Sequence, residues 1–215
     1  MAPIKACIFD LDGVIVDTAK YHYLAWRRLA NELGFDFSEN DNERLKGVSR
    51  MDSLNILLEI GGVELDEVRK QELAKKKNEW YVELIADMDK TEILPGTTQF
   101  LTELQKTGIK IALGSASKNA KTILRRIGLI EMFDTIVDGT DISKAKPDPE
   151  VFLLGAKALN VDPNECVVFE DAVSGVEAAL SAGMRVVGVG SKETLFKAND
   201  VVNSLAEMTL NRLEK

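Results

Sequence analysis

Short apolar runs that alternate with helical segments constrain the fold of this chain more than any other feature. The runs lie at 6–9, 109–113, 166–169 and 186–189, with a weaker one at 135–137. Helical patterns at 100–106, 120–127 and 176–180 lie between them, each followed by a glycine that marks a helix end. Buried strands alternating with helices form a parallel sheet covered on both faces. We therefore predict an α/β protein with a Rossmann-like parallel-sheet core.

The alternation is interrupted between Thr18 and about Met88, where only helical patterns occur. One pattern stops at Gly34, a second starts at Ser49 and stops at Gly61-Gly62, and a third covers 66–85. Because the interruption follows the first strand, it would lie over the carboxyl ends of the strands, where parallel sheets bind ligands. We predict a core of residues 1–16 and 89–215 with an inserted helical cap at 17–88.

The overall charge limits the partners of the chain. Its 215 residues carry a net charge of -8, which argues against binding to nucleic acids or anionic membranes. An anionic phosphate could still bind, but only at a local cluster of basic side chains and N–H groups. No signal sequence or membrane-spanning run is visible. Cys7 and Cys166 lie in apolar runs and are interpreted as buried, reduced thiols. We expect a monomeric cytosolic protein.

Two carboxylates follow the first apolar run, in the sequence Asp10-Leu11-Asp12-Gly13. At positions i and i+2 of a turn, both would face the ligand crevice, and Gly13 would allow a sharp turn. One carboxylate could attack phosphorus while the other moves protons. Asp10 and Asp12 are therefore candidates for a nucleophile and an acid/base. An ordinary Asp-rich turn is the alternative.

Three further strand ends carry polar residues. The second predicted strand is followed by Ser115-Ala116-Ser117-Lys118-Asn119. This segment could bind an anion, or it could simply cap the next helix. Lys146 precedes a proline in the loop after the third and could neutralise a phosphoryl group, or it is a solvated lysine. Glu170-Asp171 follows the fourth and suits magnesium, or it caps the next helix. Brought together in one crevice, these groups predict a magnesium-dependent phosphoryl-transfer enzyme.

On these residues the sequence resembles the haloacid dehalogenase superfamily, whose four motifs are matched by Asp10/Asp12, Ser115, Lys146 and Glu170/Asp171. The resemblance covers the whole chain. Within the superfamily the chain is similar to the β-phosphoglucomutases, on the segments 9–15, 17–22, 45–50, 73–78 and 115–119. Two departures are that Ala172 replaces a hydroxyl residue beside the acid pair and that Gly114 precedes the Ser-Ala-Ser run.

The resemblance implies roles for the core residues. Asp10 would be the nucleophile and Asp12 the acid/base. Asp10, the backbone carbonyl of Asp12 and Asp171 would hold magnesium, and Glu170 would act mainly through the residues that bind the ion. Ser115, the Ala116 N–H and Lys146 would hold the phosphoryl group being transferred. The second phosphate would be held by Arg50, Ser117, Lys118 and Asn119.

Five cap positions belong to the predicted site. Thr18 and His22 are four residues apart on one helix face, and the resemblance implies that His22 helps to set Asp12 when the cap closes. An ordinary surface histidine is the alternative. Gly47 and Arg50 belong to a Gly-Val-Ser-Arg turn that would place the guanidinium on the inner surface of the cap. Lys77, in a run of three lysines, reads as a solvated helix face, whereas the resemblance implies a sugar-hydroxyl contact.

The implied activity is interconversion of β-glucose 1-phosphate and glucose 6-phosphate through a phospho-aspartate and a glucose 1,6-bisphosphate. The same core would serve a sugar-phosphate phosphatase, in which water accepts the phosphoryl group. A phosphate-binding regulator without catalysis is disfavoured because every catalytic position is filled.

Overall fold

A computed structural model describes residues 3–213 and contains one six-stranded parallel sheet, in the order β3-β2-β1-β4-β5-β6. The predicted α/β fold is confirmed. The strands are β1 (Ala6–Phe9), β2 (Lys110–Gly114), β3 (Thr135–Val137), β4 (Cys166–Glu170), β5 (Arg185–Val189) and β6 (Asp200–Val202). In β1, Phe9 pairs with Leu113 of β2 on one side and Phe169 of β4 on the other. The carboxyl ends of these three strands therefore lie side by side.

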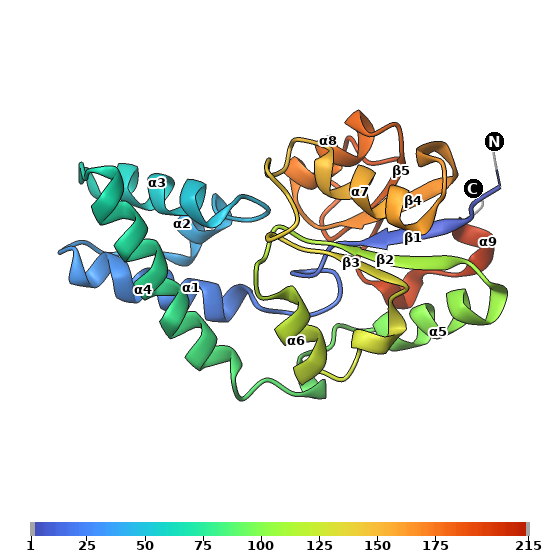
Figure 1. Cartoon of the computed structure of the whole chain (residues 1–215), viewed down its shortest axis with the longest axis horizontal. Coiled ribbons are helices and arrows are strands. Elements are labelled where there is room, and N and C mark those ends of the chain that lie inside the picture. Colours follow the sequence, from blue (N-terminus) through green and yellow to red (C-terminus); the bar gives the residue numbers. More distant parts are fainter. Residues whose placement is uncertain (1–2, 214–215) are drawn as a thin grey trace.

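Side-chain alternation along the strands divides the core into two layers. In β1, Cys7 and Phe9 contact the layer on one face of the sheet, whereas Ala6 and Ile8 contact the other. The first layer contains α5 (Thr97–Thr107) and α6 (Ala120–Arg126), and the second α7 (Glu150–Leu159) and α8 (Val173–Ser181). Figure 1 shows α7 and α8 above the sheet and α5 below it. Both cysteines are buried and free, as predicted.

The inserted segment contains four helices that stand apart from the sheet (Figure 1). They are α1 (Ala19–Glu32), α2 (Glu39–Glu43), α3 (Arg50–Gly61) and α4 (Glu67–Ile85). Ser49 accepts a hydrogen bond from the Asp52 N–H and Asp66 one from the Arg69 N–H, so side chains cap α3 and α4. Trp26 and Tyr81 are among the largest fully buried side chains and lie where α1 meets α4.

Two linkers join these helices to the core and run beside each other. Val16 in the first forms an antiparallel bridge with Ile93 in the second. The Asp17 N–H donates to the Glu92 carbonyl over 3.2 Å, and the Leu94 N–H to the Ile15 carbonyl over 3.0 Å. The Tyr21 hydroxyl adds a 2.6 Å bond to the Glu92 carboxylate. The inserted segment thus leaves and rejoins the core at one place.

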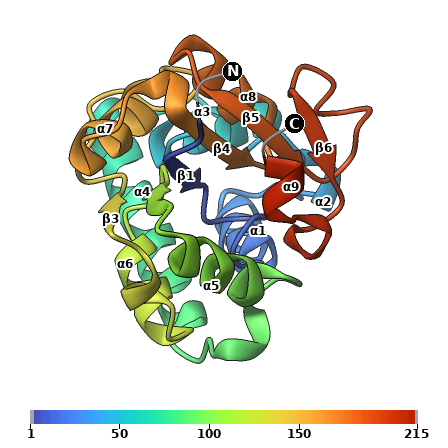
Figure 2. The same cartoon turned by 90° about the vertical axis from the view of Figure 1, so that its right-hand side faces the viewer.

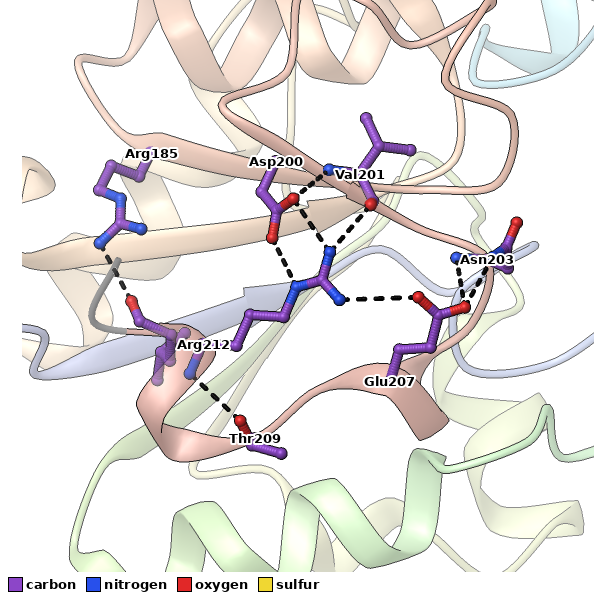
Figure 3. A network of polar contacts seen from close by, with 8 residues as sticks. Arg185, Asp200, Val201, Asn203, Glu207, Thr209 and Arg212 are labelled. Atoms are coloured by element: carbon purple, nitrogen blue, oxygen red, sulfur yellow. Dashed lines mark hydrogen bonds and ion pairs between the residues drawn. The ribbon is translucent and has the colours of Figure 1, made fainter.

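The C-terminal segment packs at the edge of the sheet formed by β6, opposite the β3 edge. Figure 3 shows the Arg212 guanidinium pointing at Asp200 and the Val201 carbonyl of β6, and toward Glu207. Arg212 belongs to α9 (Leu210–Leu213), and Arg185 of β5 donates to the Leu213 carbonyl over 3.0 Å. Figure 2 shows α9 beside β6, on the side away from α7.

Several elements differ from the sequence prediction. The short elements α2, β6 and α9 were not predicted, nor was α7. Helix α8 begins at Val173 rather than Val176. Short 3₁₀ turns occupy Lys90–Glu92, Ile130–Met132, Pro163–Glu165 and Leu205–Glu207. Within residues 3–213, no helix is long and apolar enough to cross a membrane.

Candidate active site

A cavity of about 550 Å³ lies between the inserted helices and the carboxyl ends of β1 and β2. Of the residues predicted from the sequence, every one except Glu170 lines it. These residues are Asp10, Asp12, Thr18, His22, Gly47, Arg50, Lys77, Ser115, Ala116, Ser117, Lys118, Asn119, Lys146 and Asp171. Residues from six separate segments of the chain therefore meet at one site.

Lys146 connects two carboxylates at the base of the cavity. Its Nζ lies 2.6 Å from Asp10 Oδ1 and 2.6 Å from Glu170 Oε1, and its side chain is only 1% exposed. Burial opposes the charge of Lys146, but the two carboxylates raise its pKa above the usual range, so it stays cationic. The interpretation of Lys146 as a solvated loop lysine is wrong. Glu170 also accepts from the Ala172 N–H over 2.8 Å, so it fixes Lys146 from outside the cavity.

Asp12 has the protonation behaviour that acid–base chemistry needs. Burial, followed by the charge of Asp10, raises the pKa of Asp12 to about 7, although the Thr18 hydroxyl bonded to its carboxylate lowers it. A carboxyl group with this pKa is populated in both forms near neutral pH, where it can accept or donate a proton. Thr18 itself is fully buried and orients that carboxylate.

The acidic side of the cavity fits a hard cation. Gly13 has φ +79°, and a Cβ there would overlap the Asp171 carboxylate, which therefore packs directly on the Asp10–Gly13 turn. Burial, then the charges of Glu170 and Asp10, raise the pKa of Asp171 well above its usual range. Carboxylates gathered in this way favour a divalent ion, which takes oxygen ligands. No three His, Cys, Asp or Glu side chains in residues 3–213 surround one point as a metal cage. The predicted ligand set does not require three such side chains, because it consists of the carboxylates of Asp10 and Asp171 and the backbone carbonyl of Asp12.

The loop after β2 lines the cavity and is held by hydrogen bonds between its own residues. The Ser117 N–H donates to Ser115 Oγ over 3.1 Å, and the Asn119 N–H to Ser117 Oγ over 3.2 Å. Asn119 makes no side-chain cap for α6. Its Nδ2 instead donates to Asn78 Oδ1 of α4 over 3.0 Å, which joins the core loop to the inserted helices. The plain helix-cap alternative therefore does not describe Asn119.

Lys77 is buried in an aromatic pocket, so its interpretation as part of a solvated helix face is wrong. It is 2% exposed, and its Nζ lies 3.0 Å from His22 Nδ1 and 4.3 Å from the centre of the Trp26 ring. Burial, then the charge of Arg50, lowers the pKa of Lys77 well below its usual range. Burial, then Lys77, lowers the pKa of His22 in the same way. A neutral His22 can accept a hydrogen bond from Lys77.

Gly47 and Arg50 belong to the loop and helix start that face the core. Gly47 has φ +72°, and a Cβ there would lie 2.5 Å from Ser174 Oγ of α8, so this loop touches the core beside Asp171. Arg50 is half-buried on the cavity wall and has no carboxylate partner in the described part of the chain. The Arg50 guanidinium is therefore available to an anionic ligand.

Sequence reasoning assigned no role to several residues that line the cavity. On α4 these are Gln71, Ala74, Lys75 and Asn78. Their spacing, i, i+3, i+4 and i+7, places them on one helix face, and this periodicity was visible in the sequence. Trp26 of α1 also lines the cavity.

The chain belongs to the haloacid dehalogenase-like hydrolase family, which it matches over residues 4–183. The resemblance noted from the motifs is confirmed. The chain is 45% identical to a β-phosphoglucomutase of Bacillus subtilis, over 99% of this chain and 95% of that one. The crystal structure of a β-phosphoglucomutase from Clostridium difficile superposes with a TM-score of 0.94 at 46% identity, covering 98% and 96% of the two chains. A phosphorylated carbohydrates phosphatase of Thermotoga maritima is 35% identical over 99% of both chains.

Proposed function

We propose that this chain is a β-phosphoglucomutase that interconverts β-D-glucose 1-phosphate and D-glucose 6-phosphate through a phospho-aspartate at Asp10. The observation that carries the proposal is that one cavity is lined both by carboxylates and by basic, hydroxyl and amide side chains. Asp10, Asp12 and Asp171 would form the reacting part, and Arg50, Ser117, Lys118 and Asn119 would form a second anion site; all of these residues line the cavity. A mutase needs both, because its bisphosphate intermediate carries two phosphates.

The proposed reaction begins with a phosphoryl group on Asp10. The sugar phosphate presents its free hydroxyl, whose oxygen bonds to phosphorus as the bond from phosphorus to the Asp10 oxygen breaks. Asp12 takes the hydroxyl proton. The resulting bisphosphate turns round, its other phosphoryl group bonds to Asp10, and Asp12 returns the proton to the sugar oxygen that leaves. Lys146, held 2.6 Å from Asp10, offsets the negative charge that develops on the group in transfer.

Magnesium is the proposed cofactor. Asp10, the Asp12 carbonyl and Asp171 would hold it, and Glu170 would act through Lys146 and the Ala172 N–H. When bound, the ion would offset charge on the phosphoryl oxygens. Ser115 and the Ala116 N–H would bind the same phosphoryl group, while Thr18, His22, Gly47 and Lys77 would position Asp12 and the sugar.

Further assignments complete the proposal. We keep 17–88 as the cap and 1–16 with 89–215 as the core. We also propose that the enzyme is monomeric and cytosolic; two buried free thiols agree with a reducing compartment.

A sugar-phosphate phosphatase is the second candidate, because the Thermotoga maritima relative, which matches over 99% of both chains, is named a phosphorylated carbohydrates phosphatase. In the mutase reaction a sugar hydroxyl accepts the phosphoryl group from Asp10, whereas in the phosphatase reaction water accepts it. Incubation with β-glucose 1-phosphate, magnesium and a trace of β-glucose 1,6-bisphosphate separates them when glucose 6-phosphate and free phosphate are followed together. Formation of glucose 6-phosphate in large excess over free phosphate supports the mutase. Free phosphate formed at the rate of substrate loss would establish the phosphatase instead.

A further inference from the structure

One face of α4 is fixed against the loop after β2. Gln71, Ala74, Lys75 and Asn78 form this face and line the cavity. The 3.0 Å bond between Asn78 and Asn119 joins the face to the core loop. Lys75 precedes Asn78 by three residues, which places it almost one turn, about 5 Å, further along the same face. Lys75 therefore stands over the cavity beside the proposed second anion site.

Lys75 differs from the other basic residues of α4 in having no partner. Arg69 pairs with Glu72 and Lys70 with Glu67, at 2.8 and 2.9 Å. Lys76 lies 2.6 Å from Glu32, and Lys77 lies 3.0 Å from His22. Glu72 and Glu79, three residues before and four after Lys75, are within helical reach of it. Neither pairs with Lys75, which makes no ion pair in the described residues. Its ammonium group is left available to a ligand.

Apart from Lys77 and His22, which contact each other, the basic side chains of the cavity fall into two groups. Lys46, Lys144 and Lys146 each have a carboxylate partner, at 2.8, 3.5 and 2.6 Å. The second group, which we call the basic wall, comprises Arg50, Lys75 and Lys118, and none of its members has an acidic partner in residues 3–213. They come from α3, α4 and the loop after β2. Unpaired basic side chains on a concave surface attract anions, even in a chain of net charge -8.

We propose that Lys75 is a substrate-binding residue, whose ammonium group draws the phosphate that is not being transferred onto the basic wall. This inference rests on the proposed mutase function, in which every sugar intermediate carries such a phosphate. Because Lys75 is exposed at the mouth of the cavity, its contribution is electrostatic and is screened by salt. It acts on capture of the substrate, so it alters kcat/KM and leaves kcat nearly unchanged.

The test compares Lys75→Gln with Lys76→Gln. The control changes the adjacent lysine, which is paired with Glu32 and does not line the cavity. At low salt we expect Lys75→Gln to lower kcat/KM for β-glucose 1-phosphate about three- to tenfold and Lys76→Gln less than about twofold. The difference should shrink to less than about twofold near 0.5 M NaCl, where the screening length is roughly 4 Å. Lys75→Arg should restore the rate.

A binding measurement keeps the inference testable independently of turnover. The dissociation constant of β-glucose 1,6-bisphosphate is measured by calorimetry in an Asp10→Asn background, with and without each lysine substitution. Weaker binding in the Lys75→Gln variant, but not in the Lys76→Gln variant, supports the inference. This result would hold even if the wild-type chain showed no mutase activity, an outcome that would refute the proposed function only. Equal losses in the two lysine variants, or a loss that salt does not reduce, would overturn the role of Lys75.

Discussion

Replacing Arg50 with alanine tests how the enzyme directs the phosphoryl group to sugar rather than to water. The guanidinium is half-buried on the cavity wall, and burial lowers its pKa. It has no carboxylate partner in the described residues, so its proposed contact with the second phosphate is its main polar interaction. Binding there would also hold the inserted helices closed over Asp10 and exclude water from the reacting group.

The structure sets the size of the expected effect. A hydrogen bond to a charged group contributes about 1.5–3 kcal/mol when it is well desolvated. Because Arg50 is only half-buried, part of its charge remains in water, and we expect the lower part of that range, about 1.5–2 kcal/mol. The Arg50→Ala variant should therefore lose roughly 10- to 30-fold in the mutase rate. Hydrolysis of phosphorylated Asp10 needs no second phosphate and should change much less.

The assay follows glucose 6-phosphate and free phosphate in the same reaction, so that the ratio of the two rates is measured directly. Arg44→Ala is the matched control, because Arg44 lies in the same segment, pairs with Glu59 at 3.3 Å on the surface and does not line the cavity. We expect the ratio to fall in Arg50→Ala and to stay constant in Arg44→Ala. If both rates fall together in Arg50→Ala, or neither moves, Arg50 does not hold the second phosphate.

Three further predictions concern the reacting part of the cavity and the cap. Asp10→Asn should abolish turnover while the protein stays folded, because an amide is a far weaker nucleophile; circular dichroism and a product assay check this, and residual turnover without deamidation would refute it. Asp12→Ala should lose about 10²–10⁴-fold in mutase rate with magnesium binding largely kept, and a rate near wild type would remove its acid–base role. His22 stays neutral in the folded protein, whereas in the unfolded chain it has an ordinary pKa of about 6.5. As the pH falls below that value, the unfolded chain binds a proton that the folded protein does not, which favours unfolding. Between pH 7.5 and 5.5 the wild type should therefore lose about 1 kcal/mol more stability than His22→Gln in urea titrations, and equal losses would contradict the shift.

The core of the fold was predictable because its strands are short apolar runs buried on both faces. Such strands can be recognised from their own residues, without knowing which strands they pair with. Carboxylates that directly follow an apolar run are also easy to identify in the sequence. Strand β6 (Asp200–Val202) was missed because it begins with an aspartate and offers only two apolar residues. Strand β3 is equally short and also lies at a sheet edge, but all three of its residues, Thr135-Ile136-Val137, are β-branched. Helix α2 was missed because its sequence, Glu-Asn-Asp-Asn-Glu, has no apolar face and depends on the Ser38 capping box.

The candidate site was predictable to a different extent in the two parts of the chain. On the core, residue type and strand position together indicated chemistry. On α4, three consecutive lysines look alike in sequence, yet Lys75 lines the cavity, Lys76 pairs on the surface and Lys77 is buried. Their different environments follow from the helical rotation of about 100° per residue and from the position of Trp26, which only the tertiary structure provides.

The paired linkers bear on the order in which the chain folds. In the sheet Ala6 pairs with Lys110, so β1 and β2 close a loop of about 100 residues. A helical segment that folds first brings Val16 and Ile93 together and shortens the effective loop to roughly 30 residues, which lowers the closure cost by about 1 kcal/mol. Early formation of α4 would thus speed the assembly of a sheet to which it contributes no strand. Pulse-labelling hydrogen exchange during refolding checks this, since amides of α4 should then be protected before those of β1.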